Sequence, residues 1–216
     1  MLKNGIIHIV EKWFTEVKTQ KRKIEVCPGM KVKARFKGVQ AETPTQLKKL
    51  MYLAAVCESG PIKLFKLDWS KYVKVNKNGV ERPGRVDSEF LLPFWEKIHE
   101  AAEELLGEGD INIVLDRASC HTSNLTILTL ESIFDNVIIQ PPKSPDFSLL
   151  DAYVFPQLEK KCNEQGALSH DEIDRSVKKA WKTVTHESLQ KAVKRVKKNM
   201  KECIAQKGGN FYCEGN

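Results

Sequence analysis

Residues 111–116 of the chain read INIVLD, and residues 144–151 read SPDFSLLD, so a carboxylate closes each stretch. The apolar run before Asp116 predicts a strand, while Ser-Pro-Asp predicts the start of a helix that places Asp151 about one turn further in. Two carboxylates at such positions can converge on divalent cations, because hard oxygen ligands select Mg²⁺ or Mn²⁺. A pair of these ions stabilises the attacking and leaving oxygens of phosphodiester chemistry. Asp116 and Asp151 are therefore the predicted catalytic and metal-binding residues.

The sequence around these stretches alternates between strand and helix patterns. Strands are predicted at 111–116 and 136–140, and helices at about 122–133 and 147–164. Such alternation is typical of βαβ units, whose strands pair in parallel.

The first half of the chain predicts antiparallel pairing instead. A Glu-Ser-Gly-Pro turn at 58–61 separates two apolar runs, which indicates a hairpin. Together the two halves predict an α/β fold with a mixed sheet flanked by helices, the layout that an RNase H-like fold needs. The elements predicted in the first half are a strand at 5–18 with a hairpin partner at 21–28, a basic loop at 29–46, hairpin strands at 50–57 and 62–67, a loop at 75–86 and a helix at 88–106.

The carboxy-terminal part predicts two basic helices that extend this fold. Ser169 and Glu172 fit a capping box, so a helix should begin there, and Thr185 is placed to cap a second helix. Residues 177–207 hold ten Lys or Arg residues but only two Glu. Such a strip can follow a DNA backbone, although a solvated helix face has the same composition. The predicted ranges are a catalytic unit at 1–165, these helices at 166–207 and a tail at 208–216.

The composition describes a basic globular protein. Its 216 residues are 41% hydrophobic and 29% charged, and the net charge of +7 favours a polyanionic partner such as DNA. Six cysteines form no Cys-x-x-Cys pair, so neither a zinc site nor a disulfide framework is predicted, and a reducing compartment is favoured. No apolar stretch approaches the length of about 18 residues that spans a membrane, and no signal sequence opens the chain.

Three ordered motifs resemble those of mariner-type transposases. Residues 116–122, DRASCHT, resemble the family's Asp-Asn-Ala-x-x-His segment. Residues 140–146, QPPKSPD, followed by Asp151, resemble its Pro-Pro-x-Ser-Pro-Asp stretch and third catalytic aspartate. The 34 residues between Asp116 and Asp151 match the spacing of many members. Residues 7–14, IHIVEKWF, resemble the family's His-Ile-Asp-Glu-Lys-Trp-Phe strand.

The resemblance implies an RNase H-like catalytic domain that cuts and rejoins DNA with two Mg²⁺ or Mn²⁺ ions in the nucleus. Its partners would be transposon ends and target DNA, and no membrane. The loop that corresponds to 29–46 can reach toward a partner subunit in the family, which allows a homodimer. The helix-turn-helix domains that recognise transposon ends in the family have no counterpart in these 216 residues, so the chain is expected to be a fragment or a truncated reading frame.

Val10 stands where the family has its first catalytic aspartate. An isopropyl group there removes a ligand and a negative charge from a three-carboxylate site. Glu11 is not expected to replace it, because successive strand residues point to opposite faces of a sheet, and only a bulge or a register slip would turn Glu11 inward. The predicted function is DNA cleavage and strand transfer by descent, impaired in this chain. Two alternatives are a non-catalytic DNA-binding or dimerising remnant and an RNase H-like nuclease unrelated to transposition.

Several other side chains are candidates for contact with DNA. Arg117 stands where the family usually has Asn, and its cation would either compete with a metal ion for the carboxylates or bind a phosphate. His121 could orient Asp116 or contact DNA, although a single histidine near a helix start is more often a packing or capping residue. The full candidate set is His121, Arg117, Lys143, Lys194, Arg195, Lys197 and Lys198.

Overall fold

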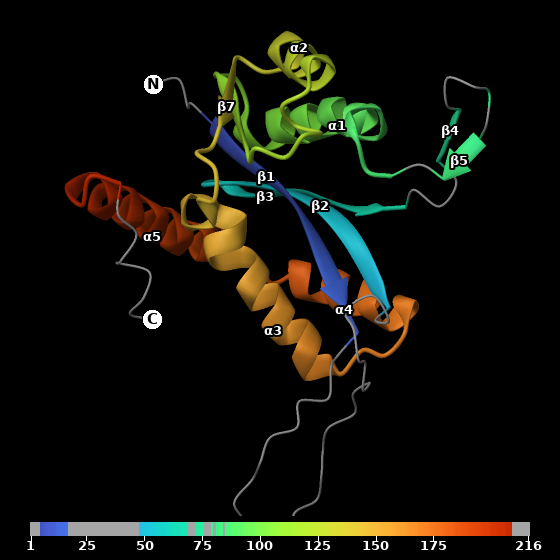
Figure 1. The fold of residues 1–216 in the computed structure, drawn as a ribbon. Helices are drawn as coiled ribbons and strands as arrows, with labels where there is room; N and C mark the ends of the chain where they lie inside the picture. Colours follow the sequence, from blue (N-terminus) through green and yellow to red (C-terminus); the bar gives the residue numbers. More distant parts are fainter. Residues whose placement is uncertain are drawn as a thin grey trace, which may run out of the picture. The chain divides into compact units, whose positions relative to one another are not determined.

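The chain is seen here as a computed structural model (Figure 1). The predicted strand at 21–28, the basic loop at 29–46 and the tail beyond 208 lie outside the residues that it describes. The described residues are 5–16, 48–68, 72–75, 79, 81–83 and 85–208.

Contacts between residues divide the chain into two compact units. These units do not coincide with the predicted ranges 1–165 and 166–207, whose standing as domains stays a prediction. The first unit comprises residues 1–12, 51–156 and 184–216, and the second comprises residues 13–50 and 157–183.

A five-stranded mixed sheet is the central feature of the first unit. Its strands are β1 (Gly5–Thr15), β2 (Lys49–Cys57), β3 (Gly60–Leu67), β6 (Ile111–Leu115) and β7 (Asn136–Ile139). They lie in the order β3-β2-β1-β6-β7, in which β2 and β3 are antiparallel while β6 is parallel to both β1 and β7. The predicted change from hairpin pairing to parallel pairing along the chain is confirmed. The last residues of β1 and the first residues of β2 belong to the second unit.

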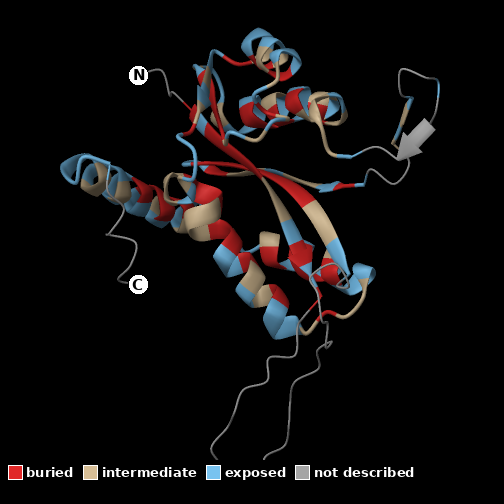
Figure 2. Cartoon of the chain, viewed as in Figure 1, coloured by how far each residue is buried: buried red, intermediate tan, exposed pale blue. Residues whose placement is uncertain are grey.

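Helices cover both faces of this sheet. The helices α1 (Ser88–Leu106) and α2 (Asn124–Ile133) lie on one face, and α5 (His186–Ala205) lies on the other (Figure 1). Ile7 of β1, Ile113 of β6 and Trp95 of α1 share one fully buried cluster on the first face. On the other face, Val114 of β6 and Val193 of α5 line a common cavity. Every residue of β6 is therefore buried, as the colouring of Figure 2 shows for the centre of the sheet.

The helix predicted at 88–106 is confirmed residue for residue as α1. Asp87 caps it, because its carboxylate accepts a hydrogen bond from the amide of Phe90 at 3.1 Å. The buried side chains recur every three or four residues and so form one stripe along the helix. These side chains are Leu91, Trp95, Ile98 and Ala102.

The loop predicted at 75–86 is wrong in part. The strands β4 (Val73–Val75) and β5 (Glu81–Pro83) pair there in an antiparallel ribbon. Gly79 lies between them with a φ of 75°, a left-handed conformation that favours glycine. Strands of three residues are too short to show an alternating pattern, so the sequence predicts only a loop here.

The helix predicted at 147–164 is broken into three parts. A 3-10 turn, η2 (Pro145–Phe147), precedes a π-helical turn, η3 (Leu150–Val154), and α3 (Phe155–Gln165) follows. Pro156 explains the wide turn, since it has no N–H for the carbonyl of Ala152. The amide of Phe155 bonds the carbonyl of Leu150, five residues back. Asp151 lies inside this wide turn.

The two carboxy-terminal helices begin where the capping residues predict. Ser169 precedes α4 (His170–Trp181), and its hydroxyl accepts from the amide of Glu172 at 3.2 Å. The carboxylate of Glu172 reaches back to the amide of Leu168 at 2.8 Å. Thr185 caps α5 by accepting from the amide of Ser188 at 3.3 Å. None of the described helices combines the length and apolarity needed to cross a membrane.

Leu130→Ala should lower the free energy of unfolding by about 3 kcal/mol, because Leu130 of α2 is fully buried and its truncation leaves a cavity in the central cluster. Leu128→Ala deletes the same atoms from the same helix where the residue is 67% exposed, and it should cost less than about 0.5 kcal/mol. Urea unfolding followed by circular dichroism gives both values. Equal losses would contradict the packing of α2 on the sheet.

Candidate active site

The register of β1 and β6 determines what stands beside Asp116. The last pair of their parallel ladder joins His8 with Val114. Continuing this register by two residues places Val10 beside Asp116, which directly follows β6. Val10 is buried, with 7% of its surface exposed. An apolar side chain therefore occupies the strand position next to the first predicted metal ligand.

Asp116 is held by two hydrogen bonds to the same oxygen. Its Oδ1 accepts from the amide of Ala118 at 2.9 Å and bonds Nδ1 of His121 at 2.7 Å. The bond with His121 lowers the pKa of the Asp116 carboxyl, and the Ala118 amide adds to this effect against the opposing influence of burial. The side chain is 46% exposed, and Oδ2 takes no hydrogen bond from the described part of the chain. Asp116 is thus a charged carboxylate with one oxygen available to a ligand.

His121 lies fully buried between two carboxylates. Its Nδ1 bonds Asp116, and its Nε2 bonds Oε1 of Glu11 at 2.8 Å. Burial opposes a charge on the imidazole, but hydrogen bonding with Asp116, Cys120 and Glu11 outweighs it and raises the pKa of His121 to about 12. The ring therefore carries a proton on each nitrogen and donates to both acids. Its predicted role in orienting Asp116 agrees with this geometry, whereas a DNA contact does not, because no part of the ring is exposed.

The sequence predicts that Glu11 is a poor substitute for a carboxylate at position 10, and the structure gives it a contact that this prediction does not include. Glu11 follows Val10 and points to the opposite face of the sheet, as alternation requires, yet its carboxylate is only 8% exposed and bonds His121. The reason is the loop after β6, which carries His121 onto the same face as Trp95, with 6.1 Å between the two ring centroids. Glu11 reaches Asp116 through His121, so neither a bulge nor a register slip is needed.

Asp151 shares an electrostatic environment with these acids. Burial raises the pKa of its carboxyl, whereas hydrogen bonding with Ser148 and the charge of Lys12 lower it. The negative charges of Asp116 and Glu11 raise it again. The charges of Asp116 and Glu11 therefore act on Asp151 in the folded chain. A divalent cation would relieve the repulsion between Asp116 and Asp151, so this pair fits a hard metal ion.

The remaining predicted residues lie on the surface. Arg117 and Lys143 are exposed, and Lys143 has a left-handed φ of 57°. The four basic residues predicted on α5 are exposed, and Lys197 among them borders the cavity that Val193 lines. The four are Lys194, Arg195, Lys197 and Lys198.

A cavity on the opposite face of the sheet was not foreseen from the sequence. Its volume is about 330 Å³, and it lies between strand residues such as Val114 and α5 residues such as Val193. His8 lines it and is 8% exposed, and Nδ1 of its ring has no hydrogen-bond partner among the residues that the structure describes. Burial lowers the pKa of His8 to about 4, so the ring is neutral.

Comparison with solved structures shows which known fold this chain has. The Mos1 mariner paired-end complex with Mn aligns with 94% of this chain and 56% of its own, at 20% identity and a TM-score of 0.74. The Mos1 paired-end complex with the left transposon end aligns with 95% of this chain and 56% of its own, at 20% identity and a TM-score of 0.72. The isolated catalytic domain of Mos1 mariner transposase aligns over 94% of this chain and 82% of its own, at 18% identity and a TM-score of 0.66. This chain has the fold of a mariner transposase catalytic domain.

The mariner transposase fold is the RNase H-like mixed sheet that the sequence predicts. The chain spans 56% of the length of the proteins in the two complexes. Neither a family model nor a curated protein sequence matches it. At this identity the likeness establishes the fold, and the chemistry rests on the residues of this chain.

His8→Phe should remove an acid-sensitive part of the stability. The pKa of His8 is about 4 in the folded chain against 6.5 ordinarily, so between these values only the unfolded chain takes up a proton. Stability should fall as the pH drops below about 6.5 and should level off near pH 4, with a total loss of about 3 kcal/mol. Urea unfolding across this range measures it. His170→Phe, at an exposed histidine, should retain the loss, and an unchanged loss in His8→Phe would contradict this account.

Proposed function

We propose that this chain is a transposase catalytic domain whose ancestral reaction is metal-dependent cleavage and transfer of DNA strands, and that Val10 impairs this reaction. One observation carries the proposal: the charge of Asp116, which stands beside Val10, raises the pKa of the Asp151 carboxyl, on a fold shared with Mos1 transposase. Two carboxylates near a basic surface are what phosphodiester chemistry with divalent ions requires. Because Mos1 structures with Mn and with Mg are known, Mg²⁺ or Mn²⁺ is the proposed cofactor.

Asp116 and Asp151 are the residues that would hold these ions, which when bound stabilise the attacking and leaving oxygens. Glu11 and His121 act behind Asp116. His121 bonds Oδ1 of Asp116 and is itself held by Glu11, so it fixes the orientation of the carboxylate and leaves Oδ2 for an ion. Glu11 and His121 are positioning residues in this proposal, as the groups behind metal ligands commonly are.

Val10 determines how well the site can work. Its isopropyl group offers no ligand where the resemblance places a carboxylate. Two carboxylates, instead of the expected three, are therefore left to hold the metal ions. The imidazolium of His121 takes part of the charge of Asp116, and the ammonium of Lys12 acts on Asp151. Each of these cations reduces the attraction for a metal ion. Weak metal binding and impaired catalysis follow from this balance of charge.

The proposed partner is DNA. Mos1 transposase is known in a complex with a transposon end, and the exposed basic residues of α5 provide a surface for phosphates in this chain. A nuclear location and a homodimer belong to the same proposal. The basic surface also supports a second candidate, a remnant that binds DNA without cutting it, because it does not depend on the carboxylates.

Val10→Asp should restore DNA nicking in the presence of Mg²⁺ or Mn²⁺, because it returns the third carboxylate beside Asp116. We expect a gain of about a hundredfold over the chain as it stands, the scale of one well-placed electrostatic group in an active site. The measurement is the rate at which supercoiled plasmid becomes nicked, with circular dichroism to confirm folding.

Two variants and three substrates control this experiment. Val10→Asn has the shape of the aspartate without its charge, and Val10→Asp combined with Asp151→Asn lacks a second ligand, so neither should gain activity. Comparing duplex DNA, single strands and RNA–DNA hybrids separates a transposase from an unrelated nuclease, which would prefer the hybrid. If folded Val10→Asp is no faster than Val10→Asn on any substrate, the non-catalytic remnant is favoured.

Replacing Lys194, Arg195, Lys197 and Lys198 by Gln should weaken binding to duplex DNA uniformly across sequences. Each lost phosphate contact should reduce the slope of log affinity against log salt by about 0.9. Fluorescence anisotropy at several salt concentrations measures this slope. The matched control replaces four exposed lysines outside residues 177–207, Lys63, Lys66, Lys97 and Lys160, by Gln, which removes the same charge. An equal effect of both sets would mean that net charge alone attracts DNA.

A further inference from the structure

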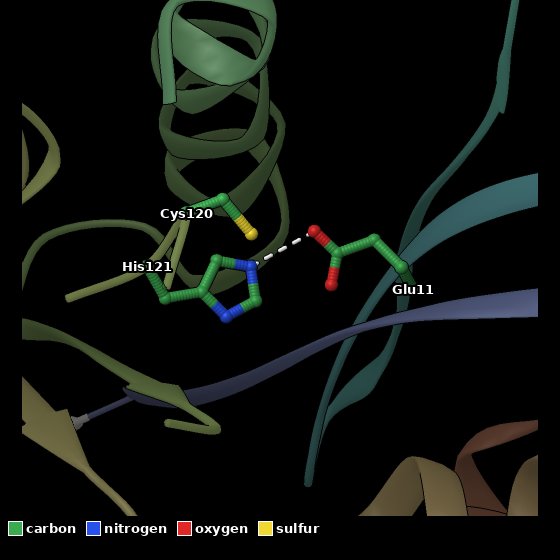
Figure 3. Close-up of side chains that lie close together, drawn as sticks. All are labelled: Glu11, Cys120 and His121. Carbon is green, nitrogen blue, oxygen red and sulfur yellow. Dashed lines mark hydrogen bonds and ion pairs between the residues drawn. The ribbon is translucent and has the colours of Figure 1, made fainter. Parts of the chain in front are cut away.

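Three side chains with different metal-binding chemistry meet behind Asp116. Glu11 comes from β1, while Cys120 and His121 come from the loop after β6, and Figure 3 shows the sulfur of Cys120 and the carboxylate of Glu11 beside the same edge of the imidazole. One ligand atom from each residue lies within 4.8 Å of the other two. Tetrahedral zinc with bonds of about 2.0 to 2.3 Å separates its ligand atoms by roughly 3.3 to 3.8 Å. The cluster is therefore compact enough to surround a zinc ion once its side chains adjust their spacing.

The donor set differs from that of the proposed Mg²⁺ pair. Thiolate and imidazole are the ligands that zinc prefers, whereas Mg²⁺ selects oxygen alone. Cys120 is partly exposed, which gives an ion access from the surface, while Glu11 and His121 are enclosed. Three protein ligands leave a fourth position for water.

Neighbouring groups already hold two of these side chains in place. Nδ1 of His121 bonds the carboxylate of Asp116, so Nε2 is the nitrogen left to face a metal ion. A carboxylate behind a ligating histidine is the arrangement found in zinc proteins. The carbonyl of Cys120 accepts hydrogen bonds from Ser88 at 3.2 Å and from Thr126 at 2.6 Å, which anchors the loop to α1 and α2.

We propose that Glu11, Cys120 and His121 form a Zn²⁺ site that ties the loop after β6 to β1 and thereby positions Asp116. The zinc ion takes the place of the proton between His121 and Glu11, whose atoms are 2.8 Å apart and need to separate by about 0.5 Å. A second proton leaves the thiol of Cys120 on binding. This site stands apart from the proposed DNA chemistry, since it uses neither Asp151 nor position 10.

No local pattern in the sequence predicts this site. Glu11 and His121 are 110 positions apart, and Cys120 has no cysteine two or three residues away. The expectation that the chain has no zinc site rests on the absence of a Cys-x-x-Cys pair, a test that only detects ligands close together in sequence.

Titration of the full-length metal-free chain with Co²⁺ tests the proposal. We expect one equivalent to produce the intense visible bands of tetrahedral cobalt together with a thiolate-to-cobalt charge-transfer band, and one equivalent of Zn²⁺ to abolish both. Cys120→Ser should lose the charge-transfer band, and its Zn²⁺ affinity should fall by more than about a hundredfold, since even groups behind a ligand are worth about 10- to 100-fold. Glu11→Gln should weaken binding while keeping that band.

Two control variants identify the site. Cys203→Ser removes a partly exposed cysteine of α5, and Asp151→Asn disables the proposed Mg²⁺ pair, and both should keep the charge-transfer band. The proposal is overturned if no band saturates at one equivalent, if the band survives in Cys120→Ser, or if Mg²⁺ displaces Co²⁺ as readily as Zn²⁺ does. Because these readouts are spectroscopic, they do not depend on whether Val10→Asp restores nicking.

Discussion

A buried imidazolium shared by two carboxylates connects the parts of the candidate site. His121 bonds Glu11 of β1 on one side and Asp116 after β6 on the other, with no part of the ring exposed. Removing one partner of a buried charge typically costs about 3 to 5 kcal/mol, because the remaining charge is left without compensation. The end of β6, the loop that follows it and β1 are therefore bound into one arrangement. Asp116 takes its orientation from this chain of hydrogen bonds.

This arrangement brings two kinds of metal chemistry close together. Asp116 and Asp151 offer hard oxygens that suit Mg²⁺ or Mn²⁺, while Glu11, Cys120 and His121 offer a mixed set that suits Zn²⁺. His121 is the link, because it would ligate zinc through Nε2 and support Asp116 through Nδ1. The proposed Mg²⁺ or Mn²⁺ site would include position 10, where valine offers no ligand, whereas the proposed Zn²⁺ site would not.

The packing of the sheet explains how the fold can be stable without a full set of metal ligands. One face packs against α1 and α2, where Ile113 and Trp95 lie in the central cluster, and the other is covered by α5. Burial on both faces stabilises the strands whatever stands at their carboxyl ends. A valine at position 10, which is 7% exposed, suits such a sheet better than an unpaired charge does. A valine at this position therefore favours folding, although it offers no metal ligand.

Local patterns in the sequence determined most of the helices and strands, and they determined where three of the helices begin. Asp87, Ser169 and Thr185 accept the amide hydrogen bonds that begin α1, α4 and α5. They also identified Asp116, Asp151 and the anomaly of Val10. Only the tertiary structure decided the wide turn around Asp151, which depends on Pro156 several residues later, and the role of Glu11. Alternation along a strand states which face a side chain takes, but not what a loop more than a hundred residues away brings to that face. His121 arrives there through packing against Trp95, and such long-range contacts leave no local pattern to read.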